Sequence, residues 1–200
     1  MDGAHMREIN MDRFGPAATE LITRALAEGR PKILPFGPSA TEVLPSLKAM
    51  TDQTLSQNRR VRMPHDAEAL HAGLWLLFDF QTESHDISQK IATPSGSFWH
   101  GILHRREPDA SNAKYWFMRV GEHPVFPELL ADARETASAS PGLSDIFLKA
   151  LDEMNAWDAA WFVDQCVTAV DPHTVKTLIT IQRREWLLLF EYNFQKAFVG

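Results

Sequence analysis

The segment AEALHAGLWLLFDF, residues 67–80, decides the fold of this chain. From residue 73 onward it is apolar on nearly every side of a helix, and a helix of that kind has to be covered by other elements. Asp66 directly precedes it, and aspartate is among the residues preferred at a helix N-cap. We therefore predict a central buried helix that begins after Asp66 and around which the rest of the chain packs.

Helical patterns fill the chain on both sides of this segment. β-branched residues are scattered, and no run alternates apolar and polar residues over the length of a strand. The sequence therefore predicts an all-α fold, a compact single-domain multi-helix bundle around the buried helix. Besides that helix, the predicted helices span about residues 17–29, 39–57, 84–91, 98–107, 110–120, 127–136, 143–155, 156–170 and 173–198.

Length, charge and cysteine content restrict the class of protein. The 200 residues suit one domain, with residues 1–15 as an N-terminal segment that we predict to be flexible. The single cysteine, Cys166, excludes an intramolecular disulfide, and neither a signal sequence nor a membrane span is evident, so we expect a cytoplasmic protein. A net charge of −6 gives no general attraction to nucleic acid or anionic membranes.

Chemically active side chains concentrate in SFWHGILHRREPDASNAKYWFMRVGEH, residues 97–123. These 27 residues include three histidines, three arginines and three acidic residues, which is more than a purely structural segment needs. Proline at 108 predicts a break between two helices and hence a helical hairpin. Gly101, Ala113 and Phe117 have the spacing of a tetratricopeptide unit, but a solenoid needs about three such units, so we predict one repeat-like hairpin.

A metal site is one interpretation of this hairpin. His100, His104 and Glu107 stand at i, i+4 and i+7, so their side chains share one face of a helix. Imidazoles with a carboxylate are ligands of zinc, manganese or iron. The alternative is that these histidines are hydrogen-bonded core residues. A zincin motif is excluded, because Gly101 stands where that motif needs glutamate.

A polar pocket is a second interpretation. Asp79 lies in an apolar run, and a buried carboxylate needs a cationic or hydrogen-bonding partner. The arginines and histidines of the hairpin could supply that partner, and a guanidinium recognises anions well. We expect one cluster in which His100 and His104 meet His85 or Asp86 and a residue of the buried helix, His71 or Asp79. The candidate ligand-binding residues are His71, Asp79, His85, Asp86, His100, His104, Arg105 and Arg106.

The segment WHGILHRREPDASNAKYWF, residues 99–117, resembles a family of bacterial and fungal proteins that share its His-Arg-Arg-Glu and Asn-Ala-Lys-Tyr-Trp runs. The resemblance covers about residues 70–127. That family has no assigned reaction, so the resemblance implies no activity.

Three functions stay open at this point. The first is a pocket that binds a small polar or anionic molecule. The second is a metal-dependent, hydrolase-like enzyme that uses His100 and His104. The third is a noncatalytic module that binds a protein partner through the hairpin. No nucleophile motif or glycine-rich phosphate loop is present, which disfavours covalent catalysis and nucleotide binding.

Overall fold

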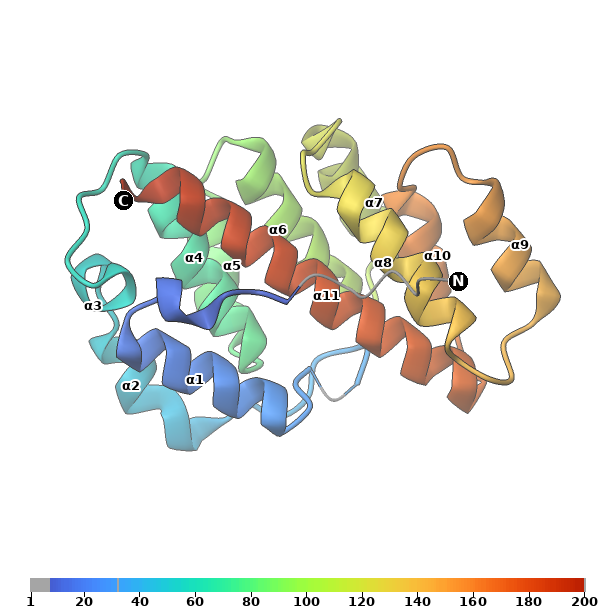
Figure 1. The fold of residues 1–200 in the computed structure, drawn as a ribbon, viewed down its shortest axis with the longest axis horizontal. Coiled ribbons are helices and arrows are strands. Elements are labelled where there is room, and N and C mark those ends of the chain that lie inside the picture. The colour runs from blue at the N-terminus through green and yellow to red at the C-terminus, as the bar shows by residue number, and fades with distance from the viewer. Residues whose placement is uncertain (1–7, 32, 200) are drawn as a thin grey trace.

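The computed structural model describes residues 8–31 and 33–199, and within them the chain is helical with no β-strand (Figure 1). One isolated antiparallel bridge joins Val61 and Phe198. None of the described helices has both the length and the apolar character that crossing a membrane requires. The α-helices are α1 (Pro16–Ala27), α2 (Leu44–Ala49), α3 (Asp52–Ser56), α4 (Pro64–Leu77), α5 (Gln81–Ser88), α6 (Pro94–Arg106), α7 (Ala110–Val120), α8 (Phe126–Ser138), α9 (Asp145–Glu153), α10 (Ala159–Thr168) and α11 (Pro172–Ala197). The all-α prediction is confirmed.

The long helix α11 crosses the molecule and packs on α4 in one half and on α8 in the other (Figure 1). Two tryptophans tie α11 to α4 and to α6 through their indole N–H groups. Trp186 donates to the carbonyl of Gly73 (2.8 Å), and Trp99 donates to Oδ1 of Asn193 (2.9 Å). Gly73 is required here, because a Cβ atom at this position would lie 2.9 Å from the ring of Trp99.

Helix α6 is even more deeply buried than α4, the helix that the sequence predicts at the centre. Every α6 residue from 95 to 106 is buried, although two thirds of them are serine, histidine, arginine or glycine. Helix α4 also begins earlier than predicted, after Met63. Asp66 therefore lies in its first turn, where its carboxylate accepts a hydrogen bond from the Asn193 amide (2.8 Å) instead of capping the helix.

Helices α6 and α7 form the predicted hairpin. Asp109 caps α7 by accepting from the Asn112 backbone N–H (3.1 Å), and Gly121 ends it with a φ of +63°. Phe117 packs directly on Gly101, where a Cβ atom would lie 3.0 Å from the phenyl ring. The close spacing of the two helices therefore depends on a glycine at position 101.

Two sequence predictions differ from the structure near the N-terminus. The helix expected over residues 39–57 divides into η2 (Thr41–Val43), α2 and α3, because Met50 is extended and Thr51 starts α3 with a capping box. Residues 1–7 of the segment expected to be flexible lie outside the described residues. Its remainder packs on α11, where the buried Phe14 ring lies 5.3 Å from that of Phe190.

A Gly101→Val substitution tests the hairpin contact. Valine gains little helix propensity over glycine, and its side chain would overlap Phe117, so we expect a loss of about 2–3 kcal/mol in the free energy of unfolding. Urea denaturation measures this loss. Met118→Ala on the exposed face of α7 is the matched control and should change stability by less than about 0.5 kcal/mol. Equal stability of Gly101→Val and the parent would contradict the packing described here.

Candidate metal centre

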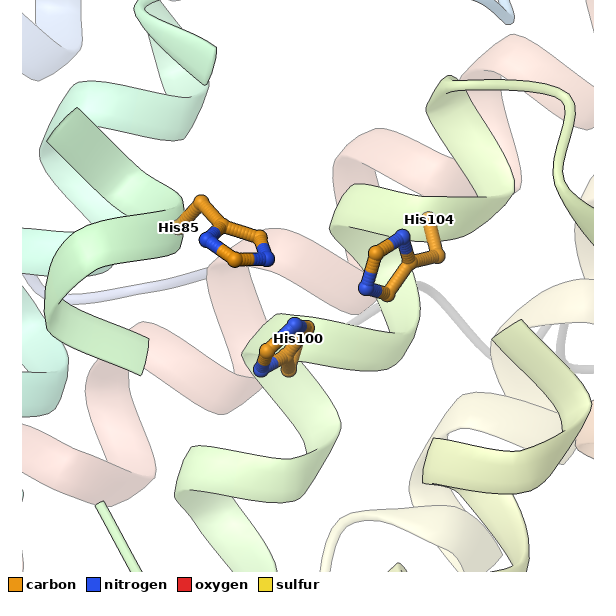
Figure 2. A group of neighbouring side chains, drawn as sticks. All are labelled: His85, His100 and His104. Carbon is orange, nitrogen blue, oxygen red and sulfur yellow. The ribbon is translucent and has the colours of Figure 1, made fainter. Parts of the chain in front are cut away.

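Three histidines from two helices converge at the α5–α6 contact (Figure 2). His85 lies on α5, whereas His100 and His104 lie one turn apart on α6. Each offers one ring nitrogen to a common group, and these atoms all lie within 4.8 Å of one another. We call these residues the histidine trio. Because they come from both helices, the trio depends on how α5 and α6 pack.

His100 is the unusual member of the trio. Its side chain is only 1% exposed, yet neither ring nitrogen has a hydrogen-bond partner among the described residues. Burial, followed by the neighbouring His104 and His85, lowers the pKa of this imidazole to about 3, so it is neutral at pH 7. Leaving a buried polar group unsatisfied costs about 1–3 kcal/mol. Packing alone does not explain a histidine at this position.

Ring contacts hold the trio in place. His100 is stacked between the indole of Trp116, at 4.0 Å between centroids, and the imidazole of His104, at 4.6 Å. His85 meets both imidazoles edge-on, at 4.7 Å from His100 and 5.6 Å from His104. These contacts restrict ring rotation and so keep the ring nitrogens close together.

Glu107 lies behind the trio and not within it. Its carboxylate accepts from Nδ1 of His104 (2.5 Å) and from the side-chain amide of Gln81. Since Nδ1 is engaged, Nε2 is the His104 nitrogen that faces His85 and His100 (Figure 2). The sequence assigned Glu107 as a metal ligand together with His100 and His104. In the structure His85 takes that place, and Glu107 orients a ligand from outside, as carboxylates commonly do for metal-binding histidines.

Asn112 and Trp116 flank the trio from α7. The amide nitrogen Nδ2 of Asn112 lies 3.1 Å from Nε2 and 3.3 Å from Nδ1 of His104. Sequence reasoning missed Asn112 as a site residue. Its only signal was a position in the first turn after the hairpin break, where a side chain can reach back to the preceding helix.

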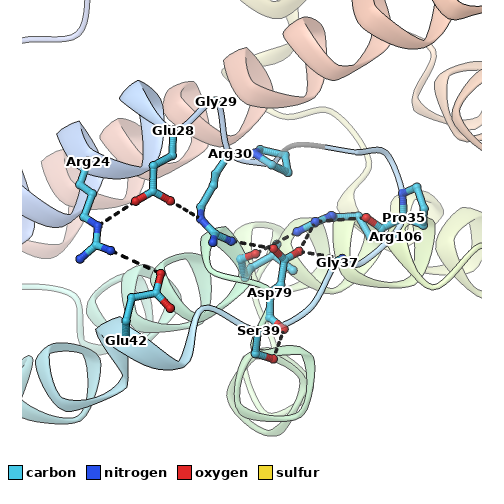
Figure 3. A network of polar contacts seen from close by, with 12 residues as sticks. Arg24, Glu28, Gly29, Arg30, Pro35, Gly37, Ser39, Glu42, Asp79 and Arg106 are labelled. Carbon is cyan, nitrogen blue, oxygen red and sulfur yellow. Dashed lines mark hydrogen bonds and ion pairs between the residues drawn. The ribbon is translucent and has the colours of Figure 1, made fainter.

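Asp79 belongs to a separate, buried network (Figure 3). It follows α4 with a φ of +63°, a conformation that aspartate tolerates better than most residues. Its carboxylate accepts from Arg30 (3.0 Å), Arg106 (2.5 Å) and the backbone N–H of Gly37 (3.2 Å). Arg106 is one of the partners expected from the sequence, whereas Arg30 was not foreseen. The network fastens Arg30 and Gly37 to the ends of α4 and α6.

The two α6 arginines are committed to structural ion pairs. Arg105 is buried and donates to both carboxylate oxygens of Glu185 and to Gln182. Arg106 donates to Asp79 and to the carbonyls of Leu76 and Pro35. The sequence predicted that these two guanidinium groups bind an anionic ligand. Their positive charges are instead paired with the carboxylates of Glu185 and Asp79.

The structure does not bring His71 or Asp86 into the trio. Nε2 of His71 lies 2.9 Å from a carboxylate oxygen of Asp52, at the α3–α4 contact. Asp86 is exposed on α5, where Gln89 donates to it (3.4 Å). Of the expected cluster, His85, His100 and His104 meet, and the buried helix α4 contributes neither His71 nor Asp79.

An open hollow of about 490 Å³ lies beside the trio on the Nδ1 side of His104. Gln81 and Glu107 form the wall that it shares with the trio. Its lining residues are Pro35, Phe36, Gln81, Arg106, Glu107, Pro108 and Asp109.

Comparison with known proteins adds no assignment. No family model matches the chain, and neither the curated proteins nor the solved structures give a match. The family resemblance of residues 99–117 stays a prediction.

An Asp79→Ala substitution tests the buried network. It would leave Arg106 buried without its carboxylate, so we expect a loss of about 3–5 kcal/mol in the free energy of unfolding. Chemical denaturation followed by circular dichroism measures this loss. Asp86→Ala removes an exposed carboxylate and serves as the control, with an expected change within about 0.5 kcal/mol. Similar stability of the two variants would show that the Asp79 ion pairs do not hold the fold.

Proposed function

We propose that the histidine trio binds a divalent transition metal ion, with zinc as the leading candidate. We further propose that the bound ion acts on a small polar or anionic molecule, as in a metal-dependent hydrolase. The observation that carries the proposal is His100, a buried neutral imidazole with two unpartnered nitrogens beside two other imidazoles. A core histidine normally has a hydrogen-bond partner, because an unsatisfied buried group is destabilising. A metal ion would supply what this group lacks.

Several features of the trio agree with zinc. Neutral imidazoles are the form that ligates metal, and burial keeps His100 neutral. Three protein ligands leave one position of a tetrahedral ion open, which is the arrangement of catalytic zinc sites. Zinc–nitrogen bonds of about 2.0–2.1 Å place ligand nitrogens about 3.4 Å apart. The ring nitrogens, now up to 4.8 Å apart, would have to approach one another, and the nearly parallel rings of His100 and His104 (22°) would have to turn so that their lone pairs meet.

The ligand set also ranks the candidate metals. Imidazoles suit zinc, copper, nickel and iron, whereas manganese and magnesium prefer carboxylate oxygens. Among the described residues no carboxylate joins the three imidazoles of the trio. Glu107 contacts His104 at Nδ1, away from the other two histidines. Manganese is therefore a weaker candidate than the sequence suggested, and zinc and iron fit better.

Zinc-dependent thermal stability tests the proposal. Chelator-treated parent protein should gain about 2.7 kcal/mol at a zinc concentration 100-fold above Kd, because the ion binds only the native state. For a domain of this size that corresponds to a rise of about 5–10 °C in Tm. His100→Leu, which fills the same space with apolar atoms, should lose the rise while folding at least as stably without metal.

His71→Ala is the matched control, since His71 pairs with Asp52 away from the trio, and it should keep the full zinc response. Differential scanning fluorimetry measures all three proteins, and elemental analysis gives the metal stoichiometry. A parent protein that shows no shift, or a His100→Leu variant that keeps it, would rule the metal centre out.

A further inference from the structure

We propose that the fourth coordination position of the trio takes a small monodentate anion and that Asn112 donates a hydrogen bond to it. This inference rests on the proposed metal function and deepens it, because it names the class of ligand and the residue that selects it. Three observations support it: the charge of the site, the position of the Asn112 amide and the shape of its surroundings.

The charge of the site favours an anion. The three ligands are imidazoles, which bind metal ions in their uncharged form, so a divalent ion would retain its full charge of about +2. The nearest carboxylate on α6, Glu107, lies on the far side of the His104 ring, where it binds Nδ1 and the Gln81 amide. An anionic fourth ligand is therefore what would offset the charge at the ion itself.

Asn112 is placed to contact that fourth ligand. Its Nδ2 atom lies 3.1 Å from Nε2 of His104, the nitrogen left to bind the ion, and 3.3 Å from Nδ1 of the same ring. With Glu107 bound to Nδ1 and an ion bound to Nε2, neither His104 nitrogen would offer the Asn112 amide a lone pair. A ligand bound to the same ion would present a new acceptor close by, and hydrogen bonds to charged acceptors are the strong ones.

The surroundings restrict the size of the ligand. Trp116 stacks on His100 at 4.0 Å, so one side of the trio is closed by an aromatic ring. His85 and Asn112 are partly exposed, whereas His100 and His104 are buried. The partly exposed residues of the site therefore lie on α5 and α7. A compact anion fits this setting better than a bulky one.

Cobalt(II) is the probe, because its visible absorption bands report coordination number and ligand exchange that zinc does not reveal. The full-length parent would be stripped of metal, loaded with cobalt(II) and titrated with azide and then thiocyanate at constant pH and ionic strength. We expect saturable changes of the cobalt bands. Asn112→Ala should still bind cobalt but hold azide about tenfold more weakly, because one charge-assisted hydrogen bond is lost.

Gln89→Ala is the matched control, since it removes an exposed side-chain amide from α5, and its azide affinity should equal that of the parent. Parent protein without cobalt bands would overturn both the metal function and this inference. Cobalt bands that ignore azide in the parent would overturn only the inference. If those bands respond to azide only after Asn112→Ala, then Asn112 is itself the fourth ligand. Equal azide affinity of parent and Asn112→Ala would overturn the role of Asn112.

Discussion

The burial of polar helix α6 is the constraint on which the rest of the structure depends. A charge taken out of water is stable only when it is paired and hydrogen-bonded, so each polar side chain of α6 requires a partner on a neighbouring element. Arg105 finds Glu185 on α11, and Arg106 finds Asp79 at the end of α4. These pairs hold α6 in one position and one rotation about its axis relative to α4 and α11.

The same requirement for partners makes His100 the best indicator of a functional site on α6. Along α6 the arginines and His104 all have partners, and His100 has none among the described residues. In the described part of the chain Arg105, Arg106, Trp157, Gln182 and Arg183 each have one buried nitrogen without a partner, whereas His100 has two such nitrogens in one ring. Such exceptions are concentrated at functional sites, where a residue is retained for what it binds. The ion pairs of Arg105 and Arg106 then give the trio a rigid base, which a metal site needs.

Much of the fold could be predicted from local patterns, and the candidate site only in part. The Asp109 cap and the Gly121 terminus of α7 follow from short-range chemistry, as does the shared face of His100 and His104. The ligand set was predicted less well. Glu107 has the right helical spacing but folds back on His104, whereas His85 enters from another helix whose rotation no local pattern specifies.

The sequence by itself determined that the chain is helical, where most helices begin and end, and which segment carries the candidate site, because caps, prolines and apolar periodicity act over a few residues. Tertiary structure alone decided which groups are paired. Arg105 and Glu185 are separated by 80 positions, and Arg30 and Asp79 by 49. Arg105 and Arg106 therefore looked available for ligands until the fold supplied their carboxylates. For His100 the sequence left a metal ligand and a core histidine open, and the packing left both of its ring nitrogens without a partner among the described residues.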